Sequence, residues 1–184
     1  NLVTVAKDVK LQIEFNSNQV KAYRLIGYEN RVLNHEDFDD DKKDAGDLGS
    51  GHVVIAFYEI ISYGFDEDID TQTFEPIENK RYEEDNDLSE LMYISLRYKE
   101  PHGDESKMID YIVENADYTN EPSETFRFAS SVIEFGLILR NSKYRYQASL
   151  NQVINRAENA MSYDPYGYRA EFLSLVEKAV NLLD

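Results

Sequence analysis

In PSETFRFASSVIEFGLILRN, residues 122–141, the hydrophobic pattern of the chain changes from the spacing of strands to that of a helix. Ser123 has the side chain expected of a residue that caps the start of a helix. The apolar residues that follow occupy most of the circumference of a helix that should end near Asn141. This pattern predicts a helix buried on several sides.

Two further helices are predicted downstream. Ser149 precedes apolar residues at helical spacing, and Asp164 with Pro165 is typical of the start of a third helix. The two apolar stripes consist of Leu150, Val153, Ile154, Ala157 and Met161, and of Phe172, Leu175, Val176, Ala179, Leu182 and Leu183. We therefore expect three helices within residues 123–183.

The chain upstream of Pro122 has the patterns of strands. Residues 7–15 alternate between apolar and polar side chains, and residues 20–28 are rich in strand-forming residues. Because residues 16–18 supply a turn, the two strands are predicted to pair as a hairpin. Residues 52–63 form a nearly continuous apolar run, which predicts a central strand.

A second hairpin is predicted from residues 91–99 and 108–113, which flank a turn that contains Pro101 and Gly103. Strands followed by helices indicate an α+β fold, with an antiparallel sheet of about five strands over residues 7–113 and a three-helix layer or subdomain over residues 123–183. The expected core consists of Val9, Leu11, Ile13, Phe15, Val53, Ile55, Phe57, Phe126, Ile133, Leu137 and Phe172.

The charge of the chain is unevenly distributed. Its net charge is −17, and residues 1–122 hold 29 acidic and 12 basic residues. We expect this acidic β-rich region and the helical region 123–184 to pack together as one domain. So acidic a surface argues against nucleic acid as a partner and against direct membrane contact. Residues 36–51 and 66–90 fit neither strand nor helix and are predicted to be exposed acidic loops.

The sequence offers little for catalysis or disulfide chemistry. The absence of cysteine excludes disulfides and thiolate sites. His35, His52 and His102 stand in three different contexts: beside an acidic loop, at a strand entry and in a turn. Gly46, Gly49 and Gly51 lack the Lys-Ser/Thr pair of a phosphate loop and instead predict turns. We therefore expect no catalytic residue and no cofactor.

One partial calcium motif occurs. Asp66, Asp68 and Asp70 match the first acidic positions of an EF-hand loop, but Thr71 and Ile77 replace its turn glycine and its closing glutamate. The earlier aspartates are Asp37, Asp39, Asp40, Asp41 and Asp44, and Lys42 and Lys43 interrupt them. No specific metal ligand is predicted from either segment.

Eight stretches carry a family resemblance: AKDVKLQIEFN (6–16), AYRLIGYENR (22–31), EDF (36–38), DDKKDAG (40–46), GH (51–52), LRYK (96–99), FGLILRNS (135–142) and YRAEF (168–172). They resemble the domain that follows the von Willebrand factor A domain in bacterial YfbK-like proteins. Residues 66–90 carry little of the resemblance and are interpreted as a variable insertion.

The resemblance implies an upstream A domain whose usual metal motif, Asp-x-Ser-x-Ser, does not occur in this sequence. It also implies a protein of the bacterial cell envelope. Because the chain starts at Asn1 without an initiator Met, we expect it to begin inside a longer protein.

Three functional hypotheses follow. The first is a non-catalytic accessory module that binds the A domain of its own chain and an unidentified protein partner. The second is an acidic module that responds to calcium, which a calcium titration of the melting temperature would separate from the first. The third is a hydrolase, which would need a convergent set of catalytic groups that the sequence does not identify.

Overall fold

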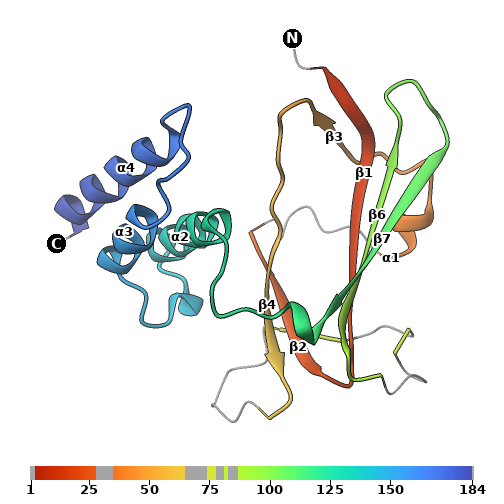
Figure 1. Cartoon of the computed structure of the whole chain (residues 1–184), viewed down its shortest axis with the longest axis horizontal. Helices are drawn as coiled ribbons and strands as arrows, with labels where there is room; N and C mark the ends of the chain where they lie inside the picture. Colours follow the sequence, from red (N-terminus) through yellow and green to blue (C-terminus); the bar gives the residue numbers. More distant parts are fainter. Residues whose placement is uncertain (1–2, 28–34, 65–73, 78–80, 83–86, 184) are drawn as a thin grey trace. The chain divides into compact units, whose positions relative to one another are not determined.

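The computed structural model describes residues 3–27, 35–64, 74–77, 81–82 and 87–183. The chain divides into two compact units, Asn1–Tyr118 and Thr119–Asp184 (Figure 1). Strands are the main regular elements described in the first unit, and three helices make up most of the second. The predicted α+β class, with antiparallel strands followed by three helices, is confirmed. The packing of the two regions against each other stays a prediction.

The larger sheet of the first unit has four antiparallel strands in the order β3-β1-β6-β7. These strands are β1 (Thr4–Phe15), β3 (Gly46–Gly49), β6 (Glu90–Lys99) and β7 (Ser106–Glu114). The predicted second hairpin is confirmed, because β6 pairs with β7 across a turn in which Gly103 N donates to Glu100 O at 3.0 Å. A 3-10 helix, η3 (Asn115–Asp117), follows β7.

The smaller sheet has the order β4-β2-β5 and corrects three predictions. Its strands are β2 (Val20–Ile26), β4 (Phe57–Ser62) and β5 (Glu75–Pro76). The predicted hairpin of residues 7–15 and 20–28 is wrong, because β1 and β2 belong to different sheets. The predicted central strand over residues 52–63 is wrong, because β4 begins at Phe57 and lies at a sheet edge. Two sheets therefore replace the single expected sheet.

A fully buried asparagine explains why β1 and β2 do not pair. The Asn16 side-chain nitrogen donates to the main-chain oxygens of Asp87 and Glu90 at 2.8 and 2.7 Å. The Asn16 main-chain N–H donates to Leu91 O at 2.9 Å, and its carbonyl accepts from Val20 N at 2.8 Å. These bonds tie the corner after β1 to the start of β6 and direct the chain into the second sheet.

Aromatic side chains fill the space beside this corner. The ring of Phe15 lies 4.8 Å from that of Tyr23 and 5.7 Å from that of Tyr58. Phe74 and Tyr82 are also buried, with exposed fractions of 7% and 2%. The segment 66–90 was predicted to be an exposed loop, and this is wrong at these two residues. Residues 66–73, 78–80 and 83–86, with Asp66, Asp68 and Asp70, lie outside the described part of the chain.

Four residues expected in the core are exposed within their own units: Leu11 (47%), Val53 (80%), Ile55 (40%) and Phe126 (52%). In β1 the cause is a bulge at Asp8, where φ is 49° and the pairing register shifts. The shift turns the polar Lys10 inward and leaves it 3% exposed.

In the second unit the structure contains α2 (Glu124–Leu139), α3 (Leu150–Glu158) and α4 (Tyr168–Leu183), with a 3-10 helix η4 (Lys143–Arg145) between the first two. The predicted caps are confirmed: Ser123 and Ser149 accept hydrogen bonds from Phe126 N and Gln152 N.

The predicted start of the third helix at Asp164 and Pro165 is three residues early. Asp164 instead closes a turn, in which its carbonyl accepts from Gly167 N at 3.2 Å and its carboxylate accepts from Ala170 N at 3.0 Å. The positive φ of Gly167, 73°, allows the chain to leave this turn and begin α4.

The helices pack closely through small side chains. Val153, Ala157, Ala160 and Val176 have no exposed surface. The ring of Phe172 on α4 lies 5.4 Å from that of Phe128 and 5.7 Å from that of Phe135, both on α2. One face of α3 is therefore committed to the core of the unit.

Candidate functional site

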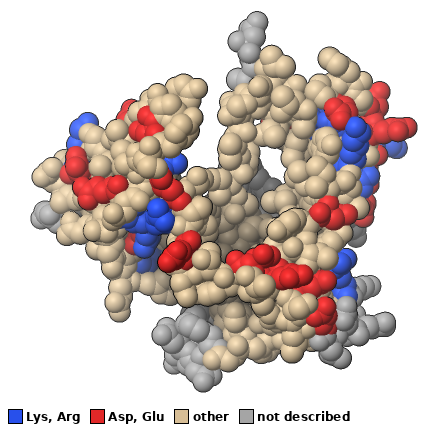
Figure 2. All heavy atoms as spheres, in the orientation of Figure 1, with Lys and Arg blue, Asp and Glu red and all other residues tan. Residues whose placement is uncertain are grey.

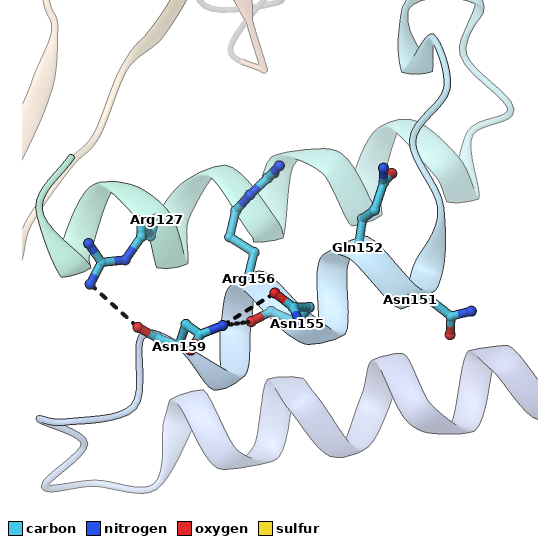
Figure 3. A pocket seen from close by; sticks show the side chains of 6 residues that line it. All are labelled: Arg127, Asn151, Gln152, Asn155, Arg156 and Asn159. Carbon is cyan, nitrogen blue, oxygen red and sulfur yellow. Dashed lines mark hydrogen bonds between the residues drawn. The ribbon is translucent and has the colours of Figure 1, made fainter. Parts of the chain in front are cut away.

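A polar pocket of about 480 Å³ lies on the helical unit. Arg127 of α2 lines one side of it, and the remaining lining residues are Asn151, Gln152, Asn155, Arg156 and Asn159 of α3 and its C-cap (Figure 3). Its volume falls in the range of about 300–1,000 Å³ that is usual for ligand pockets. All six lining residues have polar side chains: two carry guanidinium groups and four carry carboxamides.

The start of α3 determines which residues reach this pocket. Ser149 and Gln152 form a reciprocal capping box, in which Ser149 N donates to Gln152 Oε1 at 3.0 Å. With the helix fixed at that residue, Val153 and Ala157 turn into the core. The polar residues of α3 and its C-cap therefore face outward, in two rows along the helix.

The first row consists of Gln152 and Arg156, which point toward α2 in Figure 3. Arg156 forms an ion pair with Glu134 of α2. The second row consists of Asn151, Asn155 and Asn159, where Asn159 Nδ2 donates to Asn155 O at 2.8 Å. The ion pair of Arg156 holds the first row in position, and the hydrogen bond of Asn159 holds the second.

The two arginines differ in charge compensation. Arg127 donates to two main-chain carbonyls, Pro122 O at 2.6 Å and Asn159 O at 3.4 Å. Carbonyls orient a guanidinium without cancelling its charge. Among the described residues, Arg156 has a carboxylate within ion-pair distance and Arg127 has none. Arg127 is therefore the positive end of the pocket.

A second cluster of charged side chains lies in the first unit. Arg97 pairs with Asp39 at 2.9 Å and with Asp41 at 3.0 Å. Lys99 pairs with Asp8 at 2.8 Å, and its ammonium also donates to Asp41 O at 2.7 Å. Figure 2 shows basic and acidic side chains next to each other on the side of this unit that carries α1 (His35–Asp39).

Lys10 of β1 also belongs to this cluster. Its ammonium donates to the main-chain oxygens of Asp37 and Asp40, at 2.9 and 2.6 Å. These carbonyls lie at the C-terminal end of α1, where a positive charge is favourable. The residues from Asp37 to Asp41 are thus held against β1 and β6 by the bases of those strands.

The hydrogen bonds of the cluster lower the pKa values of two of its carboxyl groups. The hydrogen bond from Lys99, followed by that from Ala45 N, lowers the pKa of Asp8 below its usual value. The hydrogen bond from Ser106, together with Arg97, lowers the pKa of Asp41. Asp8 conversely raises the pKa of Lys99. All three groups are therefore charged at neutral pH and stabilise one another.

The structure also tests the predicted loop over residues 36–51 and places the histidines. The segment 36–51 was predicted to be a loop, and this is wrong in part: Gly46 and Gly49 bound β3 and Phe38 is buried, although residues 39–44 are exposed. His52 and His102 have exposed side chains in turns, and the side chain of His35 lies outside the described residues. Within the described ranges, no three His, Asp or Glu side chains are grouped as metal ligands would be.

None of the residues that line the pocket was predicted as a site residue from the sequence. The available signal was the four-residue spacing of Asn151, Asn155 and Asn159, which places three amides in one row of a helix. The contribution of Arg127 had no local signal, because Arg127 and Asn159 are 32 residues apart.

None of the described helices has the length and apolarity needed to cross a bilayer.

Comparison with known proteins gives a consistent result. The family described as "Uncharacterized protein YfbK, C-terminal" matches residues 1–182. The "Uncharacterized protein YfbK" of Escherichia coli (strain K12) is 41% identical over 183 residues, which cover all of this chain and 31% of that protein. No solved structure matches significantly. The match over nearly the whole chain confirms the resemblance noted in the sequence, and the chain belongs to the YfbK C-terminal family.

Proposed function

We propose that this chain is a non-catalytic interaction module that accompanies a von Willebrand factor A domain in a longer protein of the bacterial cell envelope. The observation that carries the proposal is the coverage of the match: the chain spans 31% of the length of its Escherichia coli relative and belongs to a C-terminal family. The remaining part of such a protein has room for the A domain that the sequence resemblance implies. The partners we propose are that A domain and a further protein.

The ionisable groups of the first unit support a non-catalytic role. A general acid or base works best when its pKa lies near the working pH. The pKa values of Asp8 and Asp41 are instead lowered, away from neutrality, by Lys99 and Ser106. Groups with these shifts hold a structure together at neutral pH and exchange protons poorly.

The pocket of the helical unit supports an interaction role. Its lining has guanidinium and carboxamide groups, which recognise other polar groups through directional hydrogen bonds. None of these side chains is a nucleophile of the kind that covalent catalysis uses.

Hydrogen exchange in the full-length protein tests this proposal. Amide exchange of the A domain is measured in the full-length protein and in a protein that ends before Asn1. We expect faster exchange on one face of the A domain when the present chain is removed, because a bound module protects the amides beneath it. Identical exchange in the two proteins would contradict an interaction with the A domain.

A further inference from the structure

The row formed by Asn151, Asn155 and Asn159 has a regular spacing. Its members are four residues apart on α3 and its C-cap, and Figure 3 shows them along one side of the helix. A rise of about 1.5 Å per residue separates successive members by about 6 Å along the axis. The row is inclined to the axis by about 26°, so the separation along the row itself is slightly larger.

This spacing matches an extended peptide. In a strand every second residue points the same way, and two residues span about 6.4–6.8 Å. A carboxamide carries both a donor and an acceptor, as the N–H and C=O of a peptide residue do. Each asparagine of the row can therefore meet one residue of an extended chain that lies along it, and successive asparagines meet every second residue.

We propose that this pocket binds an extended peptide segment with one acidic side chain, its main chain along the asparagine row and its carboxylate at Arg127. The proposal rests on the proposed interaction function and names the chemistry of the partner. The hydrogen bonds within the unit leave part of this row available. Asn159 Nδ2 donates to Asn155 O and to Asn155 Oδ1, so Asn159 offers its Oδ1 as an acceptor and Asn155 offers its Nδ2 as a donor. Among the described residues Asn151 has no side-chain hydrogen bond, so both of its amide groups are available.

The charges of the pocket favour a carboxylate over a polyanion. Arg127 is the positive charge that no carboxylate of the described residues neutralises. Glu134 stands beside Arg156 and would repel a second acidic side chain. The helical unit, residues 119–184, holds eight acidic and seven basic residues, so it does not itself repel a single negative charge strongly. The net charge of −17 on the whole chain opposes nucleic acids and anionic membranes.

Peptide libraries provide the test, with the whole 184-residue chain as the protein. One library has the form acetyl-X₃-Glu-X₃-amide, where X is any non-acidic residue. The second library has Gln in place of the central Glu. Members selected from the first library are labelled, and their binding is measured by fluorescence anisotropy. We expect a Kd below about 1 mM and a loss of about tenfold or more when Glu is replaced by Gln, as for a charge-assisted hydrogen bond.

Three variants assign the contacts. Arg127→Gln should weaken binding of the Glu peptide and make the Glu and Gln peptides equal. Asn155→Ala should weaken both peptides about three- to tenfold, because it removes a main-chain contact and keeps a good helix former. Lys178→Gln is the matched control: it removes one positive charge from an exposed position on α4 that does not line the pocket, and it should change neither affinity.

The peptides themselves give a second control. Methylation of alternate main-chain nitrogens, on the face that meets the asparagines, should abolish binding, whereas methylation of the intervening nitrogens should not. Circular dichroism of each variant checks that the total helix content is unchanged.

Several outcomes would overturn the proposal: no peptide that binds below about 1 mM, an affinity unchanged by Asn155→Ala, or a Glu preference that survives Arg127→Gln. These outcomes differ from a failure of the proposed function. If removal of the chain still alters hydrogen exchange in the A domain, only the proposal of peptide binding in the pocket is refuted. If removal does not alter exchange, the proposed interaction function is refuted as well.

Discussion

Asn16 has no exposed surface, and its side-chain nitrogen donates to two main-chain carbonyls at 2.8 and 2.7 Å. Its side-chain oxygen also accepts from Asn18 N at 3.0 Å. Asn16→Ala would leave these buried groups without their partner. We expect the free energy of unfolding to fall by about 1–3 kcal/mol, the usual cost of an unsatisfied buried polar group.

Urea unfolding followed by tyrosine fluorescence measures this loss. Ser17→Ala is the control, because it changes the neighbouring residue and leaves the network of Asn16 intact. Equal stability of the two variants would show that the corner is held by something other than the amide.

The segment from Asp37 to Asp41 is held on strands β1 and β6 by charged side chains, so its stability should depend on pH. The lowered pKa values of Asp8 and Asp41 mean that their carboxylates contribute stability above about pH 4, and that this contribution is lost as the pH falls through their folded-state values. We expect Asp8→Asn to be less stable than the parent at neutral pH. The difference should shrink as the pH falls below about 4 toward the lowered pKa of Asp8, where the parent carboxylate becomes protonated.

Denaturant unfolding between about pH 7 and pH 2 tests the prediction. Asn is a suitable replacement because it tolerates the positive φ of 49° and can still accept from Ala45 N. Asp44→Asn is the control, since Asp44 is exposed and forms no ion pair among the described residues. A constant difference between Asp8→Asn and the parent at every pH would refute the electrostatic explanation.

The elements predicted correctly are those whose signals are local. Ser123 and Ser149 accept hydrogen bonds from residues three positions ahead, so a short stretch of sequence contains the whole cap. The β6–β7 hairpin likewise has its turn and both strands in one continuous segment. The elements missed depend on distant partners. Lys10 is buried because carbonyls 27 and 30 residues away surround its ammonium, which no alternation pattern can indicate.

In the molecule as a whole, the carboxylates of the acidic segments are the candidate ligands for calcium. The carboxylates of Asp37, Asp39 and Asp41 are paired with Lys43 and Arg97, so a cation would have to displace these bases. We therefore expect calcium to leave the melting temperature unchanged at about 0.15 M monovalent salt, where weak surface attraction is largely screened.

Differential scanning fluorimetry with calcium, and with magnesium for comparison, measures this. A saturable rise in melting temperature that Asp68→Asn abolishes would instead support the calcium-responsive alternative. Asp40→Asn serves as the corresponding variant of the earlier acidic segment.

The pairing of β1 with β6 also affects how the chain is made. Lys7 pairs with Lys99, so β1 leaves the ribosome long before β6 is complete. At about 5–20 residues per second, the interval between synthesis of Phe15 and of Lys99 is on the order of 4–17 s. During that time the edge of β1 that β6 will cover is open, and another nascent chain can join it. The charged side chains of Lys7, Lys10 and Glu14 discourage such pairing, and they protect the unfinished protein from aggregation until its own strands arrive.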